Sequence, residues 1–305
     1  MIESVAFVKF SGSGNDFICI DARDGHLADV LDSPRAGRMA ASLCRRGRSV
    51  GADGVIFATH PEIEGVSDIA ARFFEPDGSE AELCGNGTAC FVYWVAANGW
   101  AGDGEIKILT PAGVVRGYRA DGQYVRVCIP DPEQMQCGLS VEAAGRTWAC
   151  DFVITGVPHA ITYVDDVDAV DVARFGPALR RHECFAPRGA NANFVQVLAV
   201  GSIAVRTFEF GVEAETLSCG TGSASAAILT TLREDWPAEY RQGRQPVLVR
   251  ARSGDVLKVW FTADDGGAIR DVCLETTVRR VYAGRLDGDH LAAALAGPAG
   301  GEPAG

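Results

Sequence analysis

A cysteine stands directly before a predicted helix in the stretch Glu82-Leu83-Cys84-Gly85-Asn86-Gly87-Thr88-Ala89. Apolar residues continue from Cys90 to Ala97, and the following Asn98-Gly99 is typical of a left-handed helix end. A thiol at a helix N-terminus lies near free backbone N–H groups, which favour its thiolate form and can also hold a carboxylate. The stretch therefore predicts a reactive cysteine in an anion site.

A second stretch of the same kind lies further along the chain. Leu217-Ser218-Cys219-Gly220-Thr221-Gly222 precedes a run of small and apolar residues that extends to Leu232. Two thiols at two helix starts suggest a pair that acts on one anionic ligand.

Other landmarks also recur in one order, which indicates an internal duplication of an α+β unit. We expect two pseudo-symmetric lobes that bring the two cysteine turns face to face across a cleft. Pro130-Asp131-Pro132 is a natural end for the first lobe, so the lobes are predicted at 1–131 and 132–275. The matched landmarks are a Gly-rich turn (12–17 and 189–194), a strand end (Gly113 and Gly254) and a hairpin end (Cys128 and Cys273).

Composition excludes several classes of partner. A net charge of −12 argues against nucleic acid and against an anionic membrane surface. No apolar run approaches the roughly 20 residues of a membrane helix. The first ten residues lack a basic region followed by an apolar core, so they predict a strand rather than an export signal. The tail 297–305 is expected to be disordered.

The ten cysteines are scattered, without a Cys-x-x-Cys pair or a nearby His pair, so no metal site is predicted. Eight of them are expected to be free thiols that pack mainly as small hydrophobes, which favours a reducing cytoplasm. These eight are Cys19, Cys44, Cys90, Cys128, Cys137, Cys150, Cys184 and Cys273.

Several motifs together resemble those of diaminopimelate epimerase. They are Lys9–Phe17, Gly51–Gly54, Asp77–Ser79 with Cys84–Gly87, Pro158-His159, Asn191 with Phe194, and Glu215–Gly222. The resemblance covers residues 6 to about 285. It implies an α+β fold of two lobes, each a barrel-like, mostly antiparallel sheet around a central helix. It also implies that a last strand near 276–288 returns to the first lobe.

The same resemblance implies an epimerase that needs no cofactor. Cys84 and Cys219 would be its acid/base pair, one taking the α-proton as thiolate and the other returning a proton to the opposite face. His159 would assist Cys84, and Glu209 would assist Cys219. The backbone of Gly85, Asn86, Gly220 and Thr221 would hold the reacting carboxylate, and the remaining substrate-binding positions would be Asn15, Glu75, Val157, Asn191 and Phe210.

Three of these positions depart from the family pattern. Glu75 and Val157 stand in place of asparagines, and Phe210 stands in place of an arginine that would hold the distal carboxylate of diaminopimelate. Losing the arginine removes a bidentate clamp, and Glu75 would repel a carboxylate. We therefore expect an amino acid that lacks the distal carboxylate. Phe210 and Val157 suit an apolar or aromatic side chain, whereas Glu75 suits a cationic or hydrogen-bonding one.

Other interpretations stay open. The protein could be diaminopimelate epimerase proper, an isomerase of a non-amino carboxylic acid, or a non-catalytic redox or binding protein. Taken singly, His159, Asn15, Asn191 and Glu75 could be ordinary turn residues, and Glu209 could lie on a solvated strand face. The expected partner is a small amino-acid substrate, and the sequence leaves open whether the protein forms a homodimer.

Overall fold

A computed structural model describes residues 3–61, 65–264 and 266–296. The chain divides into two compact units, Met1–Gln123 with Val278–Gly305 and Tyr124–Thr277. We refer to them as unit 1 and unit 2 and describe each by itself. The tail expected to be disordered, 297–305, lies outside the described residues.

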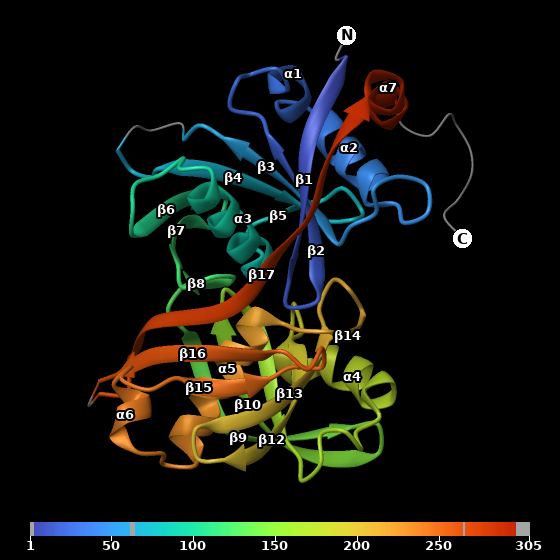
Figure 1. Cartoon of the computed structure of the whole chain (residues 1–305). Coiled ribbons are helices and arrows are strands. Elements are labelled where there is room, and N and C mark those ends of the chain that lie inside the picture. The colour runs from blue at the N-terminus through green and yellow to red at the C-terminus, as the bar shows by residue number, and fades with distance from the viewer. Residues whose placement is uncertain (1–2, 62–64, 265, 297–305) are drawn as a thin grey trace. The chain divides into compact units, whose positions relative to one another are not determined.

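Unit 1 holds the first part of the chain and its last helix (Figure 1). The strand β17 (Ile269–Asp287) begins in unit 2 and ends in unit 1. The other elements of unit 1 are β1 (Ser4–Gly12), β2 (Asn15–Asp21), α1 (Ala28–Leu31), α2 (Arg35–Cys44), β3 (Gly54–Thr59), β4 (Ile69–Phe74), β5 (Glu80–Ala81), α3 (Gly85–Ala97), β6 (Glu105–Thr110), β7 (Gly113–Arg119) and α7 (Gly288–Ala296).

Unit 2 contains the middle of the chain. It begins earlier than the expected boundary at 131, because β8 pairs with β17 from Tyr124 to Cys128. Its elements are β8 (Tyr124–Cys128), β9 (Glu133–Ala143), β10 (Arg146–Thr155), β11 (Val157–Tyr163), α4 (Val172–Arg180), the 3-10 helix η1 (Glu183–Phe185), β12 (Asn191–Ala199), β13 (Ser202–Glu209), β14 (Ala214–Thr216), α5 (Gly220–Arg233), α6 (Ala238–Arg241), β15 (Val247–Arg250) and β16 (Val256–Ala263).

Strand pairing follows one pattern in both units, which supports the duplication. In unit 1, β1–β2 is antiparallel, β2–β3 parallel, β3–β4 and β4–β5 antiparallel, β4–β6 parallel and β6–β7 antiparallel. In unit 2, β10–β11, β11–β12, β12–β13, β13–β14, β13–β15 and β15–β16 repeat this series in the same order. Antiparallel pairs predominate, and β17 adds to both units by pairing with β1 and with β16.

One predicted landmark of the duplication is wrong. The turn at 12–17 leads into β2, and the turn at 189–194 leads into β12. The pairing pattern makes β11 the counterpart of β2, and β12 the counterpart of β3. The true counterpart of Gly189-Ala190-Asn191 is therefore Gly51-Ala52-Asp53, just before β3. Short Gly-rich turns resemble one another wherever a strand begins, so their sequence alone does not show which two turns correspond.

Each unit packs its sheet around one buried helix. In unit 1, α3 contacts β1, β2, β3 and β7. It is buried on nearly all sides, as its uniformly apolar sequence predicts. A Cβ on Gly117 of β7 would lie 2.3 Å from Val92 Cγ2, so only glycine lets this strand approach the helix so closely. No helix among the described residues is long and apolar enough to cross a membrane.

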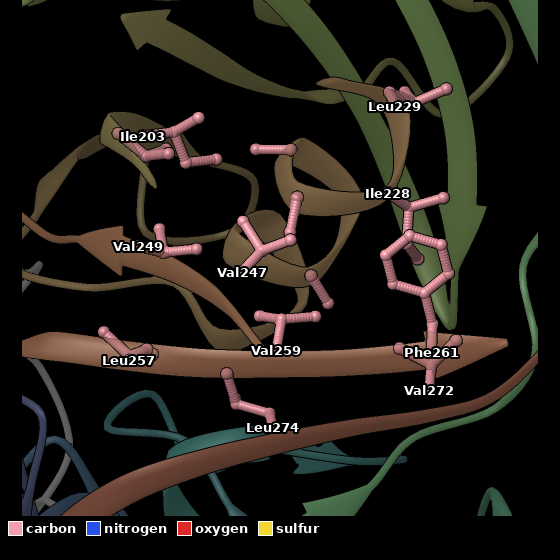
Figure 2. Close-up of a cluster of buried hydrophobic side chains, with 14 of the residues drawn as sticks. Ile203, Ile228, Leu229, Val247, Val249, Leu257, Val259, Phe261, Val272 and Leu274 are labelled. Carbon is pink, nitrogen blue, oxygen red and sulfur yellow. The ribbon is translucent and has the colours of Figure 1, made fainter. Parts of the chain in front are cut away.

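In unit 2 the corresponding helix is α5, whose apolar residues meet the strands that surround it. Figure 2 shows Ile228 and Leu229 of α5 together with Phe261 of β16 and Val272 of β17. All four side chains are almost fully buried. Burial of each contributes about 2 kcal/mol to folding. This core holds α5, the helix whose N-cap is Cys219.

The structure overturns the expectation that Cys128 and Cys273 are free. These residues lie opposite each other on β8 and β17 and form a disulfide. Each cysteine has apolar neighbours in the sequence, which suggested an ordinary buried thiol. Antiparallel pairing of β8 with β17, however, places the two sulfurs side by side. Cys137 and Cys184 are free but exposed, so they are not packing residues. The other four of the eight are free and buried, as expected.

Candidate active site

Cys84 is the N-cap of α3 in unit 1. Its backbone is extended (φ −130°, ψ 111°), and its carbonyl accepts a hydrogen bond from Thr88 N at 2.7 Å. Its Sγ accepts from Gly87 N at 3.4 Å. The N–H groups of Gly85 and Asn86 belong to the first helical turn and have no partner within the helix. The half-buried thiol thus lies beside donors that suit a carboxylate.

A chain of side-chain amides continues from α3 to the start of β2. Asn86 Nδ2 donates to Asn15 Oδ1 at 2.8 Å, and Asn15 Nδ2 donates to Asp53 Oδ2 at 3.3 Å. Asp53 also accepts from Asp16 N at 3.0 Å and pairs with Arg46 at 2.7 Å, so it is firmly held. The chain fixes the orientation of the Asn86 amide. Asn86 Oδ1 is buried and has no hydrogen-bond partner among the described residues, so it remains available as an acceptor.

Glu75 lies in the turn between β4 and β5. Its backbone N–H donates to Ser79 O at 2.9 Å, which closes the turn. Burial raises the pKa of Glu75, and the carboxylates of Asp77 and Asp53 raise it further. No described residue pairs with the Glu75 carboxylate. A half-buried carboxylate in this setting would gain from a cationic ligand.

Cys219 has the same place in unit 2 that Cys84 has in unit 1. It is the N-cap of α5, its backbone is extended (φ −121°, ψ 113°), and its carbonyl accepts from Ser223 N at 2.9 Å. Its Sγ lies 3.6 Å from Thr221 Oγ1. A Cβ on Gly222 would lie 3.2 Å from this sulfur and 2.5 Å from Asn193 Oδ1. The glycine therefore leaves room around the sulfur that no other residue would leave.

His159 lies in the same unit as Cys219. It is fully buried on β11, and its Nε2 is 3.0 Å from Thr221 Oγ1. Burial lowers the pKa of His159 to about 3, so the ring is neutral at physiological pH. The resemblance pairs His159 with Cys84, which belongs to unit 1, and that assignment stays a prediction.

Asn191 supports the turn that carries Phe210. Asn191 Nδ2 donates to Pro158 O at 3.1 Å, and its Oδ1 accepts from Phe210 N at 2.7 Å. Glu209 is half-buried at the end of β13, and Val157 is half-buried at the start of β11. Asn191, Val157, Glu209 and Phe210 all belong to unit 2, as Cys219 does.

Sequence reasoning missed the cations beside Phe210. The guanidinium of Arg180 lies 4.0 Å from the centre of the Phe210 ring, and that of Arg188 lies 5.9 Å away. Arg180 also binds Glu213 at 3.1 Å and Arg188 O at 2.9 Å. Neither arginine lies in a recognisable motif, so no local sequence signal would have found them.

Sequence reasoning also missed two residues that hold predicted site residues in place. Asp53 anchors Asn15, and Asn193 contacts His159 Nδ1 at 3.2 Å. Asp53 lies within the motif Gly51–Gly54, and Asn193 lies between Asn191 and Phe194, but neither residue was assigned a role from the sequence. Within 3–61, 65–264 and 266–296, no group of three His, Cys, Asp or Glu side chains is placed to hold a metal ion.

Comparison with known proteins extends the resemblance over most of the chain. The sequence model of the family described as diaminopimelate epimerase matches residues 7–129 and 152–269. A diaminopimelate epimerase from Aquifex aeolicus is 37% identical, and the alignment covers 93% of this chain and 99% of that protein. One from Methanocella arvoryzae is 36% identical and covers 94% and 99%.

Solved structures share the fold at low sequence identity. The PhzF-family phenazine biosynthesis protein of Bacillus anthracis has a TM-score of 0.72 at 17% identity and covers 93% of this chain and 99% of its own. A probable proline racemase from Agrobacterium radiobacter K84 has a TM-score of 0.70 at 16% identity, with 96% of each chain covered.

The fold and the two cysteine turns, taken with these relatives, define an isomerase of the epimerase and racemase class. The chain belongs to the diaminopimelate epimerase family.

Proposed function

We propose that this enzyme inverts the α-carbon of an amino acid without a cofactor and uses Cys84 and Cys219 as its acid/base pair. The observation that carries the proposal is that each duplicated unit begins its buried helix with an extended N-cap cysteine. Duplication supplies two similar groups, and inversion needs one on each face of the substrate. The thiol pair would work reduced, in keeping with the predicted cytoplasmic setting.

The reaction proposed here keeps its protons in balance. One cysteine, as thiolate, takes the α-proton and becomes a thiol, while the electron pair moves into an enolate of the carboxylate. First-turn N–H groups at the helix N-termini stabilise that growing charge. The other cysteine, as thiol, gives its proton to the opposite face and becomes a thiolate. The two thiols titrate as a coupled pair, because catalysis needs one of them protonated and the other not.

The unit 1 site offers complementary groups for both ends of a zwitterion. Gly85 and Asn86 present backbone N–H groups that suit the carboxylate. The buried Asn86 Oδ1 is an acceptor without a partner among the described residues, and it suits the α-ammonium group. An unsatisfied buried oxygen costs about 1–3 kcal/mol, which an ammonium donor would recover. These groups favour an amino acid over a carboxylic acid that lacks the amino group.

We further propose that the substrate lacks the distal carboxylate of diaminopimelate and carries a cationic side chain. Glu75 has no partner among the described residues, and the nearby carboxylates of Asp53 and Asp77 add to its negative field. Phe210 stands where the resemblance expects an arginine, and Val157 offers no amide.

Diaminopimelate epimerase proper is the second candidate. Relatives of that name are 36–37% identical over more than 90% of this chain. The guanidinium of Arg180 also lies 4.0 Å from the ring of Phe210, so positive charge persists near position 210. Both features favour an anionic group at the far end of the substrate.

Exchange of the α-hydrogen in deuterated, reducing buffer separates the two candidates. We expect proton NMR to show exchange at L-lysine, L-arginine or L-histidine. We expect LL- and meso-diaminopimelate to exchange about 100-fold more slowly, because like charges placed together cost several kcal/mol. L-leucine and L-phenylalanine serve as uncharged controls. Exchange at diaminopimelate alone would reject the altered substrate, and silence across the whole panel would reject an amino-acid epimerase.

Replacing Glu75 by glutamine should act in opposite directions on folding and on substrate binding. A carboxyl whose pKa is raised by burial destabilises the fold where it is ionised. Glu75→Gln should therefore increase the free energy of unfolding at pH 7, and this gain should vanish below the ordinary glutamate pKa. KM for a cationic substrate should rise about tenfold.

The matched control for this variant is Glu82→Gln, which changes an exposed carboxylate just after β5. Urea unfolding at several pH values and KM for a cationic and an apolar amino acid provide the readouts. An unchanged KM for the cationic substrate would show that Glu75 does not face its side chain.

A further inference from the structure

A series of hydrogen bonds in unit 2 links Asn193, His159 and Thr221, and the donor of each bond can be assigned. Asn193 Oδ1 accepts from Thr207 Oγ1 at 2.9 Å, so the other end of the amide is the NH2 group. That nitrogen lies 3.1 Å from the carbonyl oxygens of Ala160 and Asn191 and 3.2 Å from His159 Nδ1. An amide NH2 group shares two N–H bonds among these three atoms and cannot accept a hydrogen bond. A proton on His159 Nδ1 would therefore point at a donor, so His159 Nδ1 is the unprotonated, accepting nitrogen.

The unprotonated Nδ1 of His159 also determines which atom donates in the hydrogen bond between His159 and Thr221. Burial lowers the pKa of His159 to about 3, so the ring is neutral and holds one proton. Because Nδ1 is the acceptor, that proton is on Nε2. Nε2–H therefore donates to Thr221 Oγ1, 3.0 Å away.

The Thr221 hydroxyl then has its own proton free to donate, and Cys219 Sγ lies 3.6 Å from it. We propose that Thr221 is a positioning residue whose hydroxyl, oriented by His159, donates to Cys219 and stabilises it as the thiolate. When the sulfur is protonated, the S–H can donate to the same oxygen, so the hydroxyl serves both states of an acid/base group. This inference rests on the proposed function only for the catalytic role of Cys219.

Among the described residues of unit 1, a different side chain stands at the position that corresponds to Thr221. The residue two positions after Cys84 is Asn86, where unit 2 has Thr221. The Asn86 NH2 group is bonded to Asn15 at 2.8 Å, and its free atom is an acceptor oxygen. The side chain at this position is therefore a hydroxyl donor for Cys219 in unit 2, whereas in unit 1 the backbone N–H of Gly87 donates to Cys84 Sγ, 3.4 Å away.

The surroundings hold Thr221 in the required place. Thr155 Oγ1 lies 3.3 Å from Thr221 O and 2.8 Å from Ser225 Oγ, which ties β10 to the first turn of α5. Glu215, on the strand β14 that precedes α5, pairs with Arg206 of β13 at 2.6 Å and with Arg252 at 3.6 Å. The other titratable groups of this region are His159, which is neutral, and Glu209, which ends β13.

The test is the pH dependence with which iodoacetamide alkylates Cys219. Mass spectrometry of the peptide that contains Cys219 separates it from the other thiols. In Thr221→Val, which keeps the side-chain shape, the midpoint of the rate profile should move up by about 1 pH unit. Thr221→Ser keeps the hydroxyl, so its midpoint should stay near that of the original protein. Equal midpoints in all three proteins would overturn the proposal.

A second measurement needs no substitution. The 15N chemical shifts of the His159 ring should show a proton on Nε2 between pH 5 and 8, and a proton on Nδ1 would overturn the proposed assignment of donors. Neither readout uses a substrate. If the alkylation midpoint shifts in Thr221→Val but the original protein exchanges no α-hydrogen, the proposed function alone is rejected. If α-hydrogen exchange occurs but the alkylation midpoint does not shift, this inference alone is rejected.

Discussion

Cys219→Ala should reduce inversion of the α-carbon by about a thousandfold or more, because one face of the substrate loses its proton carrier. In the proposed mechanism the remaining thiol, Cys84, serves the other face. Exchange of the α-hydrogen with retention of configuration should therefore persist for one enantiomer. Cys84→Ala should show the mirror-image result, with exchange persisting for the opposite enantiomer. Chiral chromatography measures the inversion, and NMR in deuterated buffer measures the exchange.

The matched control is Cys137→Ala, which removes an exposed thiol of unit 2. That variant should keep both inversion and exchange within a factor of about two. If Cys219→Ala or Cys84→Ala inverted its substrate within tenfold of the original rate, the two-thiol mechanism would be wrong. A fall in both rates for both enantiomers with an intact fold would indicate that the cysteine also orients the substrate.

The features that sequence predicted well are those that one stretch of chain determines by itself. A cysteine, two glycines and a long apolar run define an N-cap and a buried helix locally, so α3 and α5 both begin where expected. Recurrence of that pattern, together with three other landmarks in the same order, predicted the duplication. The pairing order of the strands then corrected which short turns correspond.

The features that sequence missed depend on partners far apart in the chain. Cys128 and Cys273 are separated by 145 positions, and only antiparallel pairing of β8 with β17 makes them neighbours. Nothing around His159 in the sequence indicates that its Nε2 meets Thr221, 62 positions later. The stacking of Arg180 on Phe210 depends in the same way on how α4 packs beside β13. Such contacts follow from the tertiary fold and leave no local pattern.

The Cys128–Cys273 disulfide has a particular place in the chain. It joins the strand that enters unit 2 to the strand that leaves it, so it closes nearly all of that unit into one covalent loop. On β17, Glu275 pairs with Arg126 of β8 at 3.2 Å and with Lys258 of β16 at 2.8 Å. Glu275 is buried, so these pairs hold the strands in register but need the strands already together.

Cys128→Ser should therefore lower the free energy of unfolding of unit 2 by about 4 kcal/mol, because a long loop is released in the unfolded chain. Urea unfolding without reductant measures the loss, and Cys137→Ser is the matched control that removes a free thiol. Dithiothreitol should bring the original protein to the same midpoint as Cys128→Ser, and it should leave the variant unchanged because the variant lacks the Cys128–Cys273 bond that the reductant cleaves. Equal midpoints for Cys128→Ser and Cys137→Ser in the absence of reductant would show that the bond does not stabilise the unit. If the loss appears while α-hydrogen exchange continues in the folded variant, the disulfide stabilises the unit that carries Cys219 and takes no part in its chemistry.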